Sequence, residues 1–467
     1  MEYPQQLVFS RFTHTFEKDG VVAFMNALKL RPVFIVQATA DKLNSSIQAG
    51  TINYFMEGAN GVDSATATGI IDALREEKVL IESHEYDDYV LSNVRNVADS
   101  PKIRVAYFLM TDDCNLDCSY CFIKKGMAAG YVTSSMTQET AFAGLDMYAR
   151  LSAGDDKDER TIVIYGGEPL INATTTLQLI NRIKEYVNIG KLHSKTITSI
   201  VTNGTLLTDE ILEAIKSNGV ALGISIDGFM LAQDNNRKFT SGQKSYDTVM
   251  AAVRKCRKHQ VEFSISSTIS WDNINNFDET MNNILNVIKP SGVGFNILMD
   301  KTCSASDNDD YADKAAEFIV EAFKIFRDHG IYEDRIMRKT KAFVEGKMHI
   351  FDCAAAGGNQ IVIAPDGQVG ICQAFLGTRD YFVSSVTEAG FDPSINAAFI
   401  EWKDRAPVNM KECLDCEGLG ICGGGCPYNA FATEGTIWGL DKRFCKHTLK
   451  ALEFLVWDLY DHNKMQN

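Results

Sequence analysis

The chain has 467 residues, of which 45% are hydrophobic and 23% charged, and its formal net charge is −15. This length predicts about three domains, and no apolar run approaches the roughly 18 residues of a membrane span, so we expect no membrane partner. The negative charge argues against a nucleic-acid partner, because binding a phosphate backbone needs clustered Lys and Arg.

The first hundred residues are expected to form a small winged-helix-like module. Phe9–Leu28 contains two strand-like runs joined at Asp19-Gly20, a dipeptide that is favoured in tight hairpins. Thr66–Lys78 has apolar residues on one helical face, and the strand-like Val79–Glu82 follows it. An extension that serves only packing is the alternative. The polar stretch Asn93–Lys102 is the predicted linker to the next domain.

The middle of the chain alternates strand-like and helical segments, which predicts an α/β domain with parallel strands. Six strands are fewer than the eight that close a full barrel. The predicted strands are Ile103–Met110, Thr161–Tyr165, Thr196–Val201, Val220–Ile226, Val261–Ile269 and Val293–Leu298.

Three cysteines follow the first of these strands. Cys114, Cys118 and Cys121 would converge from one loop at the carboxyl end of a strand, where α/β proteins bind ligands. Three thiolates without a nearby His favour an iron–sulfur cluster with one open iron over a closed zinc site. A zinc knuckle and three unrelated buried cysteines are the alternatives.

A second cysteine system lies downstream and comprises Cys353, Cys372, Cys413, Cys416, Cys422, Cys426 and Cys445. A disulfide framework belongs to small secreted chains, whereas the polar start Met1–Gln6 does not resemble a signal peptide. We therefore expect reduced thiols and a cytoplasmic location. A zinc ribbon at Cys413-x2-Cys416 and Cys422-x3-Cys426 is the alternative. Cys256 shares one helical face with Val249 and Val253, so we expect it in the core.

Together the two cysteine patterns resemble those of radical S-adenosylmethionine (radical SAM) enzymes that carry a C-terminal SPASM domain. The resemblance covers roughly residues 103 to 450 and implies an open (β/α)6 barrel, three [4Fe–4S] clusters and S-adenosyl-L-methionine as cofactor. According to this resemblance, the catalytic cluster is held by Cys114, Cys118 and Cys121. Auxiliary cluster I is held by Cys353, Cys372 and Cys426, and auxiliary cluster II is held by Cys413, Cys416, Cys422 and Cys445. Cys303 is a candidate fourth ligand of auxiliary cluster I.

The resemblance also assigns cofactor contacts at the strand ends. The turn Tyr165-Gly166-Gly167-Glu168-Pro169 would receive the amino group of the cofactor, because glycines let a backbone approach a ligand closely. The remaining predicted contacts are Asn203, Ser225 and Arg237. A strand-end Ser and a solvated Arg are the alternatives for the last two.

The implied chemistry starts with one electron from the reduced cluster, which cleaves the cofactor and leaves a 5′-deoxyadenosyl radical that abstracts hydrogen. The amino-terminal module loosely resembles the peptide-recognition elements of maturases of ribosomally synthesised and post-translationally modified peptides (RiPPs), which add a leader peptide to their sheet edge. The implied function is therefore the crosslinking of a precursor peptide through a thioether or carbon–carbon bond, with a flavodoxin- or ferredoxin-type reducing partner. The implied domains are 1–95 (peptide recognition), 103–300 (barrel), 301–349 (bridging helices), 350–450 (SPASM) and 451–467 (C-terminal helix).

Sulfatase maturation is the alternative enzymatic function, and two departures count against it. Related sulfatase maturases have an acidic residue that acts as a base where this chain has Gln373. They also have Gln where this chain has Tyr165. A further cysteine ligand of these relatives is replaced by Asn359 here, which implies an open iron in auxiliary cluster I. A non-catalytic iron–sulfur electron carrier or peptide-binding module would explain the clusters but not the Gly-Gly-Glu-Pro turn.

Overall fold

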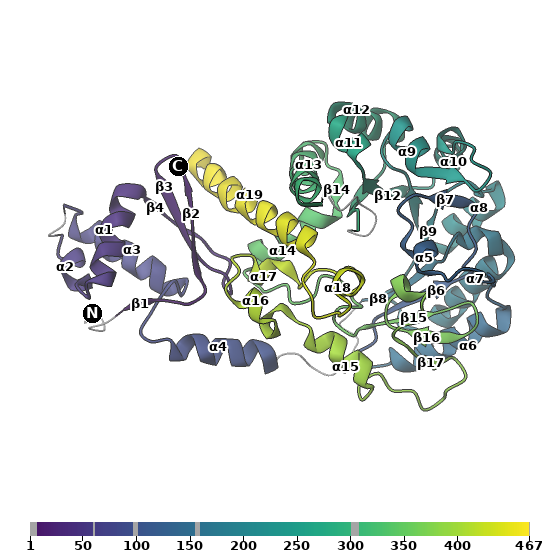
Figure 1. Ribbon diagram of the computed structural model, residues 1–467, viewed down its shortest axis with the longest axis horizontal. Helices are drawn as coiled ribbons and strands as arrows, with labels where there is room; N and C mark the ends of the chain where they lie inside the picture. Colours follow the sequence, from purple (N-terminus) through teal and green to yellow (C-terminus); the bar gives the residue numbers. More distant parts are fainter. Residues whose placement is uncertain (1–6, 59–60, 97–100, 155–158, 300–307, 467) are drawn as a thin grey trace.

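The computed structural model describes residues 7–58, 61–96, 101–154, 159–299 and 308–466. Six parallel strands form its centre, and each begins and ends within two residues of the predicted run. Figure 1 shows helices on the outer side of these strands. The strands are β6 (Val105–Leu109), β8 (Arg160–Tyr165), β9 (Thr196–Thr202), β10 (Ala221–Ser225), β12 (Phe263–Ile269) and β13 (Gly292–Ile297).

Helical segments connect the strands, and their apolar faces join the strands in one large core. Most of these helices follow the amphipathic pattern that buries one face against a sheet. They are α5 (Phe122–Gly126), α6 (Gln138–Leu151), η1 (Pro169–Asn172), α7 (Ala173–Asn188), α8 (Asp209–Asn218), α9 (Met230–Asn236), α10 (Tyr246–His259), α11 (Trp271–Asn275), α12 (Phe277–Asn282) and the π-helix η2 (Asn283–Ile288).

The sheet continues beyond the six strands on both sides. After α13 (Asn308–Asp328), β14 (Tyr332–Glu333) joins one edge, and α14 (Asp334–Glu345) follows it. At the other edge β15 (Gln360–Ile363) pairs in parallel with β6, and β16 (Gln368–Gly370) and β17 (Phe382–Ser385) complete the order β14-β13-β12-β10-β9-β8-β6-β15-β16-β17. Within the described residues the two ends do not pair, so the barrel is open. The predicted bridging region 301–349 therefore includes the strand β14. The predicted SPASM region 350–450 contributes β15, β16 and β17 to the same sheet.

The rest of the cysteine-rich region consists of short helices and turns. Glycines with positive φ end several of them, including Gly423 at φ +74° and Gly435 at φ +77°. These helices are η4 (Gln373–Phe375), α15 (Ala397–Asp404), η5 (Pro407–Asn409), α16 (Lys411–Leu414), α17 (Leu419–Cys422) and α18 (Pro427–Glu434).

The amino-terminal module is a three-stranded antiparallel sheet with helices on one face. The hairpin turn falls at Asp19 (φ +49°) and Gly20 (φ +77°), as the Asp-Gly dipeptide predicts. The elements are β1 (Val8–Phe9), β2 (Thr13–Lys18), β3 (Val21–Asn26), β4 (Val33–Val36), α1 (Gln37–Gln48), α2 (Ile52–Met56), α3 (Ser64–Glu76), β5 (Leu80–Ile81) and α4 (Glu85–Asn96). The start of the predicted linker is thus helical, because Asn93–Asn96 belongs to α4; residues 97–100 lie outside the described residues.

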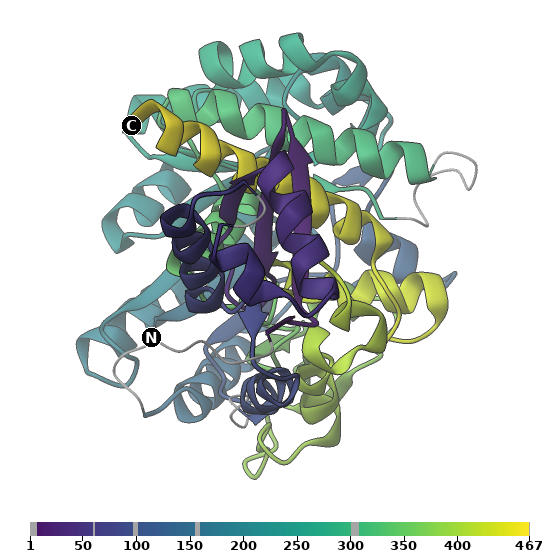
Figure 2. The same ribbon diagram turned by 90° about the vertical axis from the view of Figure 1, so that its left-hand side faces the viewer.

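The two faces of this small sheet contact different parts of the molecule. Along β3, Val22 and Phe24 join a core with α1 and α3, whereas Ala23 and Met25 pack with residues of α14 and of the last helix, α19 (Lys442–Gln466). Figure 2 shows the module in front of α19. The last helix begins nine residues before the predicted 451 and includes Cys445. Among the described residues, no helix is both long and apolar enough to cross a membrane.

Candidate functional site

The loop with the first three cysteines is fixed by a short two-stranded ribbon. Within it, β7 (Leu116–Cys118) pairs antiparallel with β11 (Arg237–Phe239), and Arg237 lies opposite Cys118 in the register. Cys121 precedes α5, and its Sγ accepts a hydrogen bond from the main-chain N–H of Lys124 at 3.4 Å. Main-chain contacts therefore set the position of the three thiols.

The three thiols lie within one another's electric field. Burial raises the pKa of Cys114 to about 12, with contributions from Cys118 and Cys121, and it raises the pKa of Cys118 to about 11, with a contribution from Cys121. The three predicted catalytic-cluster residues are thus brought together, and each is partly accessible to solvent.

A buried carboxylate connects this loop to the ends of β10 and β12. Asp227 has no exposed side-chain surface and lies 3.1 Å from Nε of Arg237. It accepts hydrogen bonds from the Tyr120 hydroxyl and, at 2.9 Å, from the main-chain N–H of Thr268. The Arg237 guanidinium also lies 5.3 Å from the centroid of the Tyr120 ring. Arg237 is therefore a buried ion-pair partner beside Cys118, and not the solvated arginine of the alternative interpretation.

The Gly-Gly turn after β8 packs directly against the cysteine loop. A Cβ on Gly166 would lie 2.4 Å from the carbonyl oxygen of Thr111, and one on Gly167 would lie 2.1 Å from that of Asp113. The Gly167 N–H donates to the Thr111 carbonyl at 2.8 Å. The two glycines thus allow two protein segments to approach each other, a reason that the sequence interpretation, based on ligand approach, did not include.

The carboxyl group of Glu168 is engaged inside the protein. It is fully buried and accepts hydrogen bonds from the Thr202 hydroxyl (2.7 Å) and from the main-chain N–H groups of Asn203 (2.7 Å) and Leu170 (3.0 Å). Burial raises its pKa to about 7. The side chain therefore joins the ends of β8 and β9.

The remaining predicted cofactor contacts lie at neighbouring strand ends. Asn203 donates from Nδ2 to Oδ1 of Asn115 at 2.8 Å, and this Nδ2 lies 3.9 Å from Sγ of Cys114. Ser225 is the last residue of β10 and is half-buried. Six of the seven residues predicted to contact the cofactor therefore lie at or just after the carboxyl ends of β8, β9 and β10, and the seventh, Arg237, lies in β11 opposite Cys118.

Two aromatic side chains contact each other near the cysteines. The Tyr165 ring contacts the Tyr107 ring edge-on with centroids 6.0 Å apart, and neither phenol has a hydrogen-bond partner among the described residues. Burial raises the pKa of both phenols, with smaller contributions from Cys121 for Tyr165 and from Cys353 and Cys372 for Tyr107. Sequence analysis missed Tyr107, although its position between the buried Ala106 and Phe108 predicts that it faces the other side of β6.

The downstream cysteines also approach one another in the predicted sets. Burial raises the pKa of Cys413 and of Cys445 to about 12, and Cys422 and Cys416 contribute to both shifts. Burial raises the pKa of Cys372 as well, with contributions from Cys426 and Cys353. Cys303 lies outside the described residues. Within the described ranges, no group of three or more His, Cys, Asp or Glu side chains is arranged to hold a metal ion.

Two positions that distinguish this chain from sulfatase maturases make internal contacts. Gln373 accepts a hydrogen bond through Oε1 from Gln360 at 3.1 Å. Asn359 accepts one through Oδ1 from the main-chain N–H of Lys102 at 3.1 Å. Neither residue supplies a carboxylate or a thiolate to the site.

Comparison with known proteins gives the family of the barrel. Residues 108–289 match the model of the Radical SAM superfamily. The chain therefore contains a radical SAM domain. It is 24% identical over 407 residues to the radical SAM cyclopropyl synthase TigE of Paramaledivibacter caminithermalis (82% of this chain, 81% of the relative). It is 23% identical to the cysteine-type anaerobic sulfatase-maturating enzyme of Clostridium novyi (68% of this chain, 86% of the relative).

Solved structures share the fold. The structure of anSMEcpe with bound AdoMet and the Cp18Cys peptide has a TM-score of 0.63 at 18% identity and covers 77% of this chain and 99% of its own. Streptococcus suis SuiB bound to the precursor peptide SuiA has a TM-score of 0.50 at 14% identity, and covers 94% of this chain and 100% of its own. The match to SuiB therefore extends over more of this chain than the match to anSMEcpe does.

Proposed function

We propose that this enzyme forms a crosslink, a thioether or a carbon–carbon bond, in a ribosomally made precursor peptide. The observation that carries the proposal is the amino-terminal module on α19, since similarity to SuiB, which was solved with a precursor peptide, covers 94% of the chain. The small sheet of this module has β2 and β4 at its edges, where an extended leader segment could add as a further strand.

The donor set of the first loop fits an iron–sulfur cluster, because it consists of three thiols at the mouth of the barrel. Under the proposal Cys114, Cys118 and Cys121 hold this cluster, which together with S-adenosyl-L-methionine supplies a carbon radical that abstracts hydrogen when both are bound. Arg237, held by Asp227, is assigned to the cofactor carboxylate. Asn203, Ser225 and the main chain at Gly166 and Gly167 complete the cofactor contacts.

The two downstream sets also contain only thiols, which are preferred ligands of iron–sulfur clusters. We assign Cys413, Cys416, Cys422 and Cys445 to a closed auxiliary cluster. Cys353, Cys372 and Cys426 hold the other, whose remaining position is assigned to a substrate thiolate or to Cys303. Reduced thiols in three sets fit a cytoplasmic enzyme supplied by a flavodoxin or ferredoxin.

Maturation of sulfatases is the second candidate, and the higher TM-score of anSMEcpe, 0.63, favours it. The side chain of Gln373 argues against it, because an amide bonded to Gln360 does not accept a substrate proton.

Co-expression with precursor peptides encoded near the gene tests the proposal. We expect one peptide to lose two hydrogens, and fragmentation to locate the link between two residues. A sulfatase-derived Cys or Ser peptide serves as the comparison substrate. Conversion of that peptide to formylglycine, without any crosslink in the precursor peptides, would establish the second candidate instead.

A further inference from the structure

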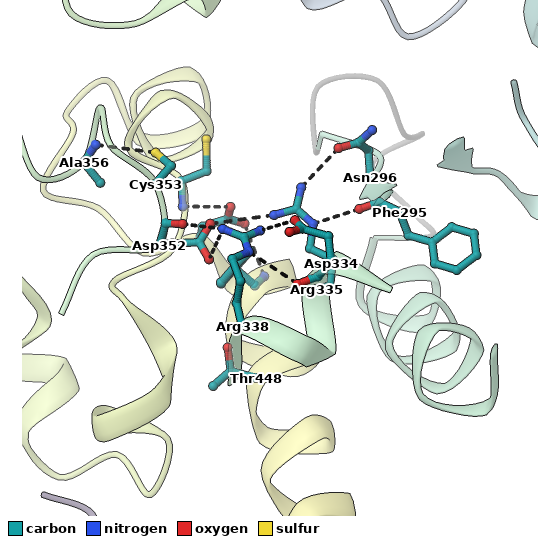
Figure 3. Close-up of polar contacts among 12 residues, drawn as sticks. Phe295, Asn296, Asp334, Arg335, Arg338, Asp352, Cys353, Ala356 and Thr448 are labelled. Carbon is teal, nitrogen blue, oxygen red and sulfur yellow. Dashed lines mark hydrogen bonds and ion pairs between the residues drawn. The ribbon is translucent and has the colours of Figure 1, made fainter. Parts of the chain in front are cut away.

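Two arginines on α14 converge on the residue that precedes Cys353 (Figure 3). Nη1 of Arg338 lies 3.5 Å from Oδ1 of Asp352, and it also donates a hydrogen bond to the main-chain carbonyl of Asp352. Arg335, one helical turn earlier, lies 3.7 Å from Oδ2 of Asp352. Since the carbonyl of Asp352 belongs to the peptide unit that leads into Cys353, Arg338 contacts both the carboxylate and the main chain beside this thiol.

The pair is largely removed from water, so its charges act strongly on their surroundings. The Asp352 side chain is 11% exposed and that of Arg338 27%. Asp352 is therefore a buried carboxylate that is paired with two arginines of α14.

Asp352 also touches the segment that carries other cysteines. Its N–H donates to the carbonyl of Gly423 at 3.0 Å, and a Cβ on Gly423 would lie 2.4 Å from the nitrogen of Asp352. Gly423 follows Cys422 directly and precedes Cys426 by three residues. The position of Cys353 relative to Cys426 thus depends on contacts of Asp352.

The opposite end of this network reaches the barrel. Nε of Arg335 donates to the main-chain carbonyl of Phe295 at 2.8 Å, and its Nη2 donates to Oδ1 of Asn296 at 3.1 Å. Both residues belong to β13. Polar contacts therefore run without interruption from the end of a barrel strand through α14 to the residue beside Cys353.

We infer that Arg338 and Asp352 are positioning residues for Cys353, and that their opposite charges set the reduction potential of the auxiliary cluster that Cys353 holds. This inference rests on the proposed function only for the presence of that cluster. A nearby cation stabilises the reduced, more negative form and raises the potential, whereas a nearby carboxylate lowers it.

Two substitutions with opposite electrostatic effects test the inference in the full-length, anaerobically reconstituted protein. Arg338→Gln is expected to lower the reduction potential of the cluster, and Asp352→Asn is expected to raise it. Potentials are measured by redox titration followed by electron paramagnetic resonance, and the relevant signal is the one that Cys372→Ala abolishes. The matched control is Arg327→Gln, which removes an exposed pair with Asp458 (2.9 Å) far from these cysteines and should leave the potential unchanged.

A role limited to packing would shift both variants in the same direction or release iron from both, and either result would overturn the inference, as would unchanged potentials. If Arg338→Gln does not retain the cluster, Arg338→Lys should retain it, because this variant keeps the charge; loss of the cluster from the Lys variant also overturns the inference. Failure of the proposed auxiliary cluster assignment looks different: the wild-type protein would then contain iron for the catalytic cluster alone.

Discussion

The cysteines proposed to bind the catalytic cluster and those proposed to bind the auxiliary cluster are held in place by different means. Cys114, Cys118 and Cys121 lie in one short loop, which main-chain pairing of β7 with β11 fixes to the barrel. Cys353, Cys372 and Cys426 come from segments far apart in the chain, and Asp352, which precedes Cys353, pairs with Arg338 and donates a main-chain hydrogen bond to Gly423. From this difference we expect the positions of Cys114, Cys118 and Cys121 to tolerate substitutions elsewhere in the chain. The relative positions of Cys353, Cys372 and Cys426 should instead depend on contacts made by other parts of the fold.

The largest expected effect comes from removing each set of thiols separately. Replacement of Cys114, Cys118 and Cys121 by Ala should abolish formation of 5′-deoxyadenosine. The iron of the auxiliary clusters should remain, because other thiols, downstream in the chain, hold those clusters. A variant in which Cys353, Cys372 and Cys426 are replaced should still cleave the cofactor in the absence of peptide, but it should not form the crosslinked peptide. Iron content and product chromatography check both. Cofactor cleavage by the first variant would refute the assignment.

The same contrast explains how much of the molecule the sequence predicts. The six barrel strands were predicted closely because each is a short apolar run between turns, and the cysteine loop because its residues are adjacent in sequence. The ribbon of β7 and β11, the parallel pairing of β15 with β6 and the Arg338–Asp352 pair were missed. Each of these joins residues that are distant in the chain, and propensity or periodicity contains no information on such partners. The linker prediction failed at Asn93–Asn96 because polar residues also occupy exposed helix faces, as in α4.

Asp227→Asn should produce the next largest effect, because it leaves the buried Arg237 guanidinium without its partner. Breaking a buried ion pair in this way costs about 3 kcal/mol, and Tyr120 loses a charged acceptor at the same time. We expect a lower melting temperature and weaker binding of the cofactor. Asp146→Asn is the matched control: its carboxylate is 53% exposed and pairs with Lys191, so the cost should stay below about 1 kcal/mol. Equal losses in the two variants would contradict the assigned role of Asp227.

A smaller effect should appear as a change in pH dependence at Glu168. Burial raises its pKa from 4.5 to about 7, so between these pH values the folded state keeps a proton that the unfolded state releases. This group therefore contributes stability below about pH 4.5, and the contribution, at most about 3 kcal/mol, is lost as the pH rises to about 7. Glu168→Gln should flatten the fall in melting temperature over this range. Glu139→Gln changes an exposed carboxyl group whose pKa is lowered, and should keep the wild-type profile. Parallel profiles for wild type and Glu168→Gln would contradict this interpretation.

The smallest effect is expected at Cys256, which sharpens the comparison between cysteines that bind a cluster and those that only pack. Cys256 is fully buried with Val249 and Val253 on α10, and burial raises its pKa to about 11, so it remains a neutral thiol. Cys256→Ala removes one sulfur from a packed core and should cost about 1 kcal/mol of stability, with iron content and cofactor cleavage unchanged. Cys372→Ala, at another buried cysteine, should instead lose the iron of one cluster. Iron loss from Cys256→Ala would show that burial on a helix face does not separate structural from ligating thiols in this protein.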